Sequence, residues 1–383
     1  MISTRHGNQN GTPPGRHEGV RVTIVSDAAP HRNGVGSYYC DLGSHLRGRL
    51  GHIRIVSPTK KNSGMYLLSF PMPGDASQHI RVPNAPVVWN RLKRTRPDVI
   101  IVPSPGLFGL LGLCFAEHYK IPLVVGLHTD YDQLTSLYWK GMWRRITRRY
   151  LHMVNALLVR RSDVVMAANN ELVSVAERLG SARVERIGSI IPRQFVERPV
   201  PHPAHNRIQR VLFAGRLAHE KNLPAVIAAA KALPQIAFSL AGEGPLRQMV
   251  ETEAERLPNL TYLGWLSRRH LMRELDRADL LVLPSHLETF GTVAMEAAAR
   301  GCLVLVSNRC GLLDWDALSA NVLKMDAGEP LWKAIKRASE LAPEKRRSMR
   351  VNSRYATQQF NLSTVNRWED VLSSLASGKA LSI

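Results

Sequence analysis

The sequence predicts an α/β protein with two domains, each built around a parallel sheet. Short apolar runs of strand length alternate with helical patterns, which is typical of doubly wound parallel sheets. The 383 residues are enough for two hydrophobic cores. A stretch rich in proline and polar residues, 186–206, interrupts the alternation and indicates where the domains are joined.

We expect a disordered tail at 1–20, an N-terminal domain at 21–197, a linker at 198–208, a C-terminal domain at 209–357 and a final helix within 358–383. We expect that helix to pack back on the N-terminal domain. The strands expected in the first domain are 21–26, 52–57, 99–103, 122–126 and 164–168. In the second domain one strand ends at Gly215, and the others are 237–241, 260–263, 280–283 and 303–307.

Composition excludes several classes of protein. No apolar run has the length of a membrane-spanning helix, and residues 1–19 lack the apolar centre of a signal peptide, so we expect a cytoplasmic location. The four cysteines form no CxxC pair, which favours reduced thiols over a metal site. The net charge of +20 favours anionic partners, either membrane lipid or nucleic acid.

The most informative stretch is 280–301, which reads as a strand, a loop with Glu288 and Gly291, and a helix containing Glu296. Open α/β sheets bind ligands at the carboxyl ends of their strands. The helix start offers unpaired amides and a positive dipole end to a phosphate. Two carboxylates and these amides match the hydroxyls and diphosphate of a nucleotide sugar, although two solvated acids beside a helix would have the same spacing.

Other strand ends carry candidate ligand-binding residues. Arg216 and Lys221 follow Gly215, and two cations just past a strand can neutralise a diphosphate. The remaining candidates at strand ends are Gly34, Gly36, His128 and Gly242. The alternatives are surface charge for the two cations, a flexible turn for the glycines Gly34 and Gly36, and a structural role for His128.

Two Asp-x-Asp pairs, Asp130 with Asp132 and Asp314 with Asp316, are candidate ligands for a divalent metal. Neither pair has further ligands in view, so we expect no metal site.

Residues 137–154 combine aromatic and apolar residues at helical spacing with a series of cations. Such a helix is similar to one that lies in a lipid headgroup layer. A core-packed helix with a solvated basic face is the alternative. The expected membrane contacts are Trp139, Lys140, Trp143, Arg144, Arg145, Arg148 and Arg149.

The motifs GRLAHEKN, AGEGP, YLGW and HLETFGTVAMEAAARG occur in an order that resembles the C-terminal half of family-4 retaining glycosyltransferases with the GT-B fold. The glycines near Gly34 and the segment HTDY resemble the N-terminal half, and HTDY is similar to that of bacterial glycolipid-forming members. The resemblance implies two Rossmann-like domains whose parallel sheets face across a cleft.

The resemblance also implies roles for the candidate residues. Arg216 and Lys221 would hold the donor diphosphate and stabilise the departing nucleotide, taking the electrostatic role of a metal. Glu288 would contact the transferred sugar, Glu296 the ribose hydroxyls, and His128 would lie near the sugar. Residues 262–265 would border the base, and the other donor contacts would be Gly34, Gly36, Gly215, Gly242, Phe290, Gly291, Thr292 and Val293.

Two segments depart from the family pattern: GSIIPRQF at 188–195, and RCGLLDWD at 309–316 in place of a Gly-Gly with a following Glu. Both leave the details of donor and acceptor contacts open.

We therefore expect a hexosyltransferase that needs no cofactor and uses a nucleotide sugar with retention of anomeric configuration. The expected donor is a UDP-sugar. The expected acceptor is a membrane lipid such as diacylglycerol, reached by peripheral attachment to the inner face of the cytoplasmic membrane. The alternatives are a soluble or polysaccharide-precursor acceptor, an epimerase on the same fold, and a basic nucleic-acid-binding protein.

Overall fold

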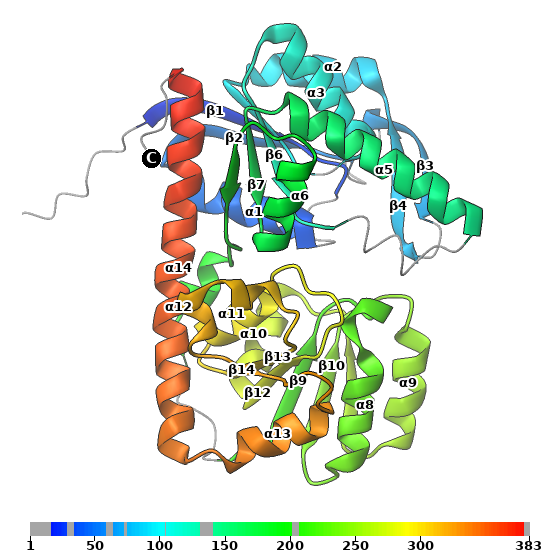
Figure 1. The fold of residues 1–383 in the computed structure, drawn as a ribbon, viewed down its shortest axis with the longest axis vertical. Helices are drawn as coiled ribbons and strands as arrows, with labels where there is room; N and C mark the ends of the chain where they lie inside the picture. Colours follow the sequence, from blue (N-terminus) through cyan, green and yellow to red (C-terminus); the bar gives the residue numbers. More distant parts are fainter. Residues whose placement is uncertain are drawn as a thin grey trace, which may run out of the picture.

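The computed structural model describes residues 17–28, 34–58, 64–72, 75–103, 105–130, 141–200 and 207–378. Within them the chain forms two six-stranded parallel sheets and one two-stranded hairpin. The two sheets belong to the two halves of the chain and lie one above the other in Figure 1. The predicted tail, as far as residue 16, and the linker residues 201–206 lie outside the described residues.

The sheet of the N-terminal half has the order β2-β1-β5-β6-β7-β8. Two of its central strands, 99–102 and 123–127, are fully buried and consist of Val, Ile and Leu apart from Gly126, as expected for strands covered by helices on both faces. The strands are β1 (His17–Val25), β2 (Leu50–Val56), β5 (Val99–Val102), β6 (Leu123–Leu127), β7 (Val164–Ala167) and β8 (Val184–Arg186). The helices are α1 (Gly34–Leu46), α2 (Ala85–Thr95), α3 (Leu107–Tyr119), α5 (Gly141–Arg161), α6 (Asn170–Arg178) and α7 (Arg193–Glu197).

The C-terminal half repeats this arrangement with the strand order β11-β10-β9-β12-β13-β14. The strands are β9 (Arg210–Ala214), β10 (Ala237–Ala241), β11 (Leu260–Gly264), β12 (Leu280–Leu283), β13 (Leu303–Val306) and β14 (Leu323–Lys324). The helical segments are η2 (His219–Lys221), α8 (Leu223–Ala232), α9 (Arg247–Arg256), α10 (Arg268–Arg277), α11 (Thr292–Ala299), η3 (Gly311–Asp314), α12 (Asp316–Ser319), α13 (Leu331–Glu340) and α14 (Pro343–Ser377).

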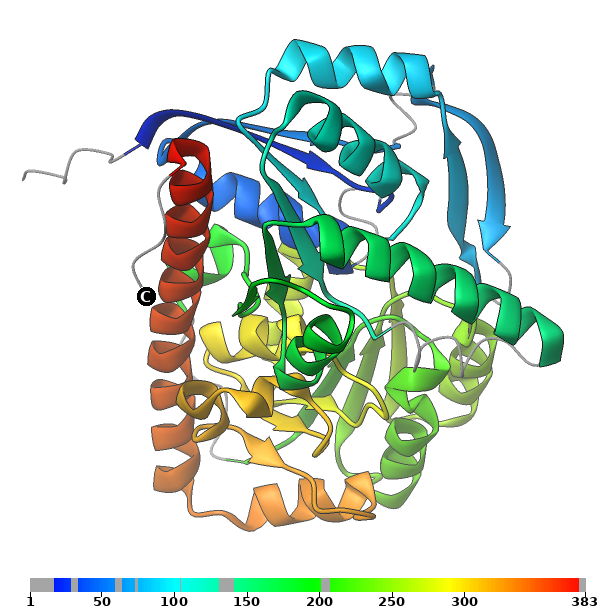
Figure 2. The ribbon, with the colours of Figure 1, turned by 45° about the horizontal axis from the view of Figure 1, so that its top comes forward.

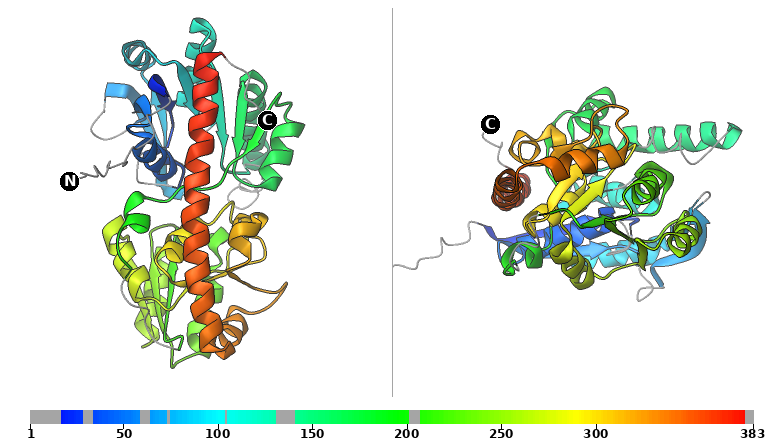
Figure 3. Two further views of the ribbon diagram at one scale, coloured as in Figure 1. Left: turned by 90° about the vertical axis from the view of Figure 1, so that its left-hand side faces the viewer. Right: turned by 90° about the horizontal axis from the view of Figure 1, so that it is seen from below.

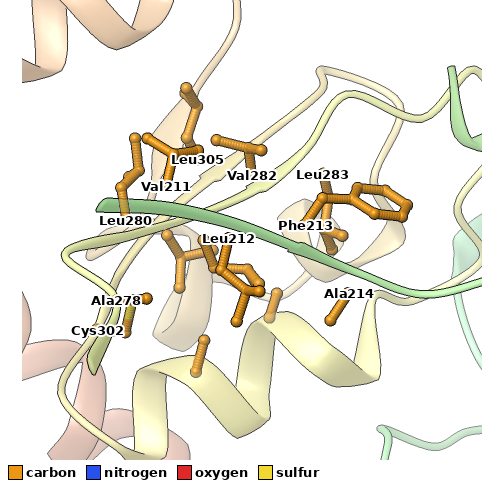
Figure 4. Close-up of a cluster of buried hydrophobic side chains, with 14 of the residues drawn as sticks. Val211, Leu212, Phe213, Ala214, Ala278, Leu280, Val282, Leu283, Cys302 and Leu305 are labelled. Atoms are coloured by element: carbon orange, nitrogen blue, oxygen red, sulfur yellow. The ribbon is translucent and has the colours of Figure 1, made fainter. Parts of the chain in front are cut away.

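The core of the C-terminal half forms around β9 and β12, whose side chains pack between the covering helices (Figure 4). Phe213 and Leu280 are both fully buried there. This packing fixes the strand ends from which the candidate site residues extend.

Three features differ from the sequence analysis. β1 begins at His17, so it includes residues assigned to the tail, because His17 pairs with β2 as residues 21–25 do, across a register shift. The antiparallel hairpin of β3 (Tyr66–Met72) and β4 (Asp75–Pro83) was not expected, since its sequence lacks regular alternation and leaves Phe70 and Ile80 half exposed. α14 begins at Pro343 and not within 358–383, because no Gly or Pro interrupts the helix before Gly378.

α14 runs along both halves of the molecule, as Figures 1 and 3 show. Its second half carries Trp368, a fully buried residue whose Nε1 donates a hydrogen bond to the Tyr38 hydroxyl of α1 at 2.7 Å. Val371 and Leu372 pack into the same core cluster as Val22 and Ile24 of β1. The last helix therefore completes the core of the N-terminal half.

We expect Trp368→Ala to lower the free energy of unfolding by about 3–5 kcal/mol, because it removes a large buried side chain and leaves a cavity. Leu362→Ala, on the same helix at a position that is 49% exposed, serves as control and should have a much smaller effect. Urea unfolding measures both. A loss of less than about 1 kcal/mol for Trp368→Ala would contradict the role assigned to α14.

Candidate functional site

Four of the predicted site residues extend from loops at one edge of the C-terminal sheet. Arg216 and Lys221 follow β9, Gly242 follows β10, and Glu288 follows β12. Because the strands are parallel, their carboxyl ends meet at the same edge. The sheet itself thus brings these residues to one place.

Lys221 and Glu288 form an ion pair, with 2.7 Å between Lys221 Nζ and Glu288 Oε2. Their side chains are only 18% and 13% exposed. The Ser285 hydroxyl donates a hydrogen bond to the same carboxylate oxygen at 3.3 Å. The backbone of Glu288 is fixed as well, since its carbonyl accepts from the amide of Gly311 at 2.9 Å. The acid and the cation are therefore held in place together.

Arg216 is held by Glu220, which the sequence analysis did not single out. Arg216 Nη1 lies 3.4 Å from Glu220 Oε1, and Glu220 is buried. The carbonyl of Glu220 accepts a hydrogen bond from the amide of His286 at 2.8 Å. Glu220 thereby links the loop after β9 to the loop after β12. It belongs to the segment AHEKN, whose charged residues are visible in the sequence.

Gly242 allows its backbone to touch that of Gly215. Gly242 has a φ of +144°, and a Cβ atom there would overlap the carbonyl oxygen of Gly215. The Gly242 amide donates to the carbonyl of Gly264 at 2.8 Å, and the Tyr262 hydroxyl donates to the carbonyl of Gly242 at 3.0 Å. The loops after β9, β10 and β11 are packed directly against one another, which explains Gly242 in structural terms. A Cβ atom on Gly215 would make only an ordinary contact with the Phe213 ring, at 3.6 Å.

α11 begins beside Glu288. Gly291 caps the helix with a φ of +88°, and a Cβ atom there would lie 2.9 Å from Cys310 Sγ. The first turn of any helix has amides without intrahelical partners, and Thr292 and Val293 occupy that turn. Phe290, just before the cap, is buried in the core. The helix start that the sequence predicted is present at this place.

Glu296 lies inside α11 close to charged residues of both halves. Its pKa is raised to about 8, chiefly by burial and then by the nearby Asp41 carboxylate, while Arg268 acts in the opposite direction. Near neutral pH this carboxyl group therefore keeps its proton and is able to donate a hydrogen bond as well as to accept one.

Asp41 on α1 and Arg268 on α10 join the two halves through an ion pair that the sequence analysis did not predict. Arg268 Nη2 donates to Asp41 Oδ2 at 2.6 Å, and Nη1 contacts the other carboxylate oxygen. Burial raises the pKa of Asp41 to about 6, although Arg268 opposes this shift. The pair places α1, whose first turn contains Gly34 and Gly36, next to Glu296.

The two segments that depart from the family pattern also lie between the halves. Ser189, in the first segment, has its hydroxyl 2.6 Å from that of Thr292 on α11. Asp314, in the second segment, accepts a hydrogen bond from the amide of Asn170 at the start of α6 at 2.9 Å. Asp132, from the other acidic pair, lies outside the described residues. Asp314 thus has a structural function at the interface.

His128 follows β6, and its Nε2 lies 2.9 Å from the hydroxyl of Tyr39 on α1. Burial lowers the pKa of His128 to about 4, so its imidazole is neutral near pH 7. Gly36 is buried near the start of α1, and Gly34 is exposed at its first position. α1 therefore carries the glycine pair, the partner of His128 and the partner of Arg268.

The basic helix α5 extends beyond the body of the N-terminal half (Figure 2). Its apolar residues Met142, Ile146 and Met153 are 68%, 51% and 61% exposed, so this stripe is not part of the core. Trp139 and Lys140 lie outside the described residues, as does the side chain of Trp143. The four other predicted membrane contacts are all exposed: Arg144, Arg145, Arg148 and Arg149.

The described residues contain no helix with the length and apolar character needed to cross a membrane. In that same part of the chain, no three His, Cys, Asp or Glu residues gather as a metal site would require.

Models of two protein families match the chain. Residues 32–194 match "Glycosyltransferase Family 4", and residues 200–355 match "Glycosyl transferases group 1". The second model covers the loops that carry Arg216, Lys221, Glu288 and Glu296.

Two curated relatives are similar to parts of the chain. Glycogen synthase of Mycobacterium tuberculosis is 32% identical over 57% of this chain, and the chain spans about half of that relative's length, 53%. A GDP-mannose-dependent alpha-(1-6)-phosphatidylinositol dimannoside mannosyltransferase of the same species is 26% identical over 70% of this chain and 68% of its own length.

Solved structures confirm the predicted fold class. Sucrose-phosphate synthase from Thermosynechococcus elongatus has a TM-score of 0.74 at 18% identity, covering 94% of this chain and 100% of that one. Anabaena HepE in complex with UDP-glucose has a TM-score of 0.66 at 16% identity, covering 92% and 100%. These likenesses show the GT-B fold.

We expect the stability of Glu296→Gln relative to the wild type to increase with pH. The raised pKa means that the folded protein holds a proton that the unfolded chain releases above its ordinary pKa of 4.5, so wild-type stability falls as pH rises from about 4.5 to 8. Glutamine has no such proton. The difference in unfolding free energy should grow by up to about 1.4 kcal/mol per pH unit in this range.

Thermal and urea unfolding at pH 5.5 and 7.5 measure this difference. Glu255→Gln removes an exposed carboxylate from the C-terminal half and serves as control. Equal stability differences at the two pH values for Glu296→Gln would contradict the raised pKa of Glu296.

Proposed function

The chain belongs to the family-4 type of GT-B glycosyltransferases, and from this premise we propose that it transfers a hexose from a nucleotide sugar with retention of anomeric configuration. The observation that carries the proposal is the ion pair of Lys221 with Glu288, held at the strand edge beside Arg216 and the start of α11. A nucleotide sugar needs cations for its diphosphate and an acid for its hydroxyls, and this edge offers both.

Each group has a part in the proposed reaction. Cleavage of the bond between sugar and diphosphate develops negative charge on the phosphates, which Arg216, Lys221 and the first amides of α11 would stabilise. Glu288 would hold the transferred sugar, and Glu296 the ribose. We propose a front-face displacement in which the leaving phosphate helps to deprotonate the acceptor, with the two cations in place of a metal ion.

We propose a UDP-linked hexose as donor. HepE, which shares the fold, has been solved in complex with UDP-glucose. The phosphatidylinositol dimannoside mannosyltransferase is named as GDP-mannose-dependent, so GDP-mannose is the second donor to examine. The family models and the relatives named above all concern glycosyl transfer, which favours an enzyme over a nucleic-acid-binding protein.

We propose that the N-terminal half takes a lipid acceptor at a membrane surface, such as diacylglycerol at the inner face of the cytoplasmic membrane. The exposed apolar stripe of α5 and the arginines beside it support this proposal, because such a helix suits the boundary between headgroups and acyl chains. A lipid-linked acceptor also appears in the name of the phosphatidylinositol dimannoside mannosyltransferase. A soluble or polysaccharide-precursor acceptor is the alternative, which the name of glycogen synthase supports.

We expect Arg216→Ala and Lys221→Ala each to lower turnover of the nucleotide sugar by about 10²–10³-fold, since each removes a group that stabilises charge in the transition state. Lys231→Ala is the matched control, because Lys231 also pairs with a glutamate, Glu253 at 2.6 Å, but on the surface of α8. Release of UDP or GDP measures turnover, after thermal stabilisation has identified the donor. Near-normal rates in both site variants would refute the phosphate role.

We expect replacement of four α5 arginines, Arg144, Arg145, Arg148 and Arg149, by Gln to weaken binding to anionic vesicles by about 10²-fold or more. Each arginine near such a surface contributes about 1 kcal/mol. Flotation with phosphatidylglycerol and with neutral phosphatidylcholine vesicles at low salt measures binding.

The control for the vesicle experiment replaces four exposed arginines of the C-terminal half, so that the net charge changes equally: Arg256, Arg273, Arg277 and Arg347. Equal loss in the two variants would assign binding to overall charge. Absence of wild-type binding to anionic vesicles would remove the membrane proposal, while leaving the donor reaction to be judged by turnover.

A further inference from the structure

Tyr39 and His128 form a contact that the proposed reaction has not yet used. The Tyr39 hydroxyl lies 2.9 Å from His128 Nε2, and the two rings stand edge to face with centroids 5.4 Å apart. Tyr39 is 1% exposed. The neighbouring Tyr38 packs on the same imidazole with a centroid distance of 4.7 Å. Two rings of α1 therefore fix the position of His128.

Gly126 provides the space for this contact. It lies within β6, two residues before His128, in an extended strand that any residue is able to adopt. A Cβ atom there would overlap the Tyr39 hydroxyl oxygen and lie 3.0 Å from His128 Nε2. A glycine is therefore required at this position by the pair of side chains and not by the backbone.

The direction of the hydrogen bond follows from the protonation states. Burial raises the pKa of Tyr39 well above its ordinary value, so its hydroxyl keeps its proton. Since the His128 ring is neutral near pH 7, one of its nitrogens is an acceptor. A buried hydroxyl needs an acceptor for its proton, and Nε2 occupies that place. The ring proton of His128 is then on Nδ1.

We propose that Tyr39 is a positioning residue that fixes His128 as the Nδ1–H tautomer, with Gly126 leaving the space in which the two side chains meet. The consequence for catalysis rests on the proposed function. In that reaction, His128 presents a single hydrogen-bond donor, Nδ1–H, near the sugar that is transferred. Tyr39 acts through His128, and we assign it no contact of its own with the nucleotide sugar.

The tautomer is measured by ¹⁵N NMR of the full chain labelled at histidine, with the His128 signals assigned by their loss in His128→Gln. The wild type should show His128 protonated on Nδ1. Tyr39→Phe removes the hydroxyl and should give a mixture of both tautomers. The same tautomer in the wild type and Tyr39→Phe, or protonation on Nε2 in the wild type, would overturn the proposal.

Tyr38→Phe is the matched control. Tyr38 is also buried on α1 and contacts the imidazole, but its hydroxyl bonds the carbonyl of Gly188 and Nε1 of Trp368. This variant should lose stability and keep the tautomer of His128. A tautomer change in Tyr38→Phe as large as that in Tyr39→Phe would assign the effect to general loosening of α1 and overturn the proposal.

A double-mutant cycle tests the space at Gly126. Gly126→Ala should lower the thermal midpoint clearly less in Tyr39→Phe than in the wild type, because the overlap with the hydroxyl oxygen is then absent while the close contacts with His128 Nε2 and the Tyr39 ring remain. Additive effects of the two changes would contradict the contact.

Turnover connects the tautomer to the reaction. Tyr39→Phe should lower kcat about tenfold, as expected when one hydrogen bond of ordinary strength is lost. A changed tautomer with unchanged kcat would overturn the role of Tyr39 in transfer. A wild type that turns over no nucleotide sugar would refute the proposed function instead, because the NMR experiment uses no substrate and decides the tautomer by itself.

Discussion

The largely buried ion pair of Lys221 with Glu288 is the interaction on which the candidate site depends. An isolated buried charge is costly, and removal of one partner leaves the other without compensation. Two hydrogen bonds hold the pair in place: the Ser285 hydroxyl donates to the carboxylate, and the Gly311 amide donates to the carbonyl of Glu288. In the proposed reaction, the diphosphate of the donor would meet a cation that is already in position and would share it with an acid.

Most of the sheet architecture could be predicted because buried parallel strands have a local signature, a short run such as 280–283 followed by a glycine or a polar loop. The Lys221 and Glu288 loops were predicted for the same reason, since each directly follows a strand. The β3–β4 hairpin could not be predicted, because its apolar residues Phe70 and Ile80 are half exposed and its pattern is irregular. Strand and helix ends were also less certain, as the early start of α14 shows.

The residues that join the two halves were beyond the reach of local patterns. Asp41 and Arg268 are 227 positions apart in sequence, and nothing in either segment indicates the other. A cation in the first turn of a helix is unfavourable because the helix dipole is positive there, yet Arg268 occupies the first position of α10. The carboxylate of Asp41 compensates this charge, and both groups act on Glu296. Only the folded chain shows that three ionisable groups from α1, α10 and α11 form one cluster.

The path of α14 along both halves affects how the protein folds during its synthesis. Four of its residues, Val365, Trp368, Val371 and Leu372, belong to the core of the half that is synthesised first. A ribosome therefore releases that half with a vacant apolar face, which stays uncovered while the remaining residues are translated. Domains usually fold one after another during synthesis, but here the core of the earlier domain is completed by α14, which follows the second domain in the sequence.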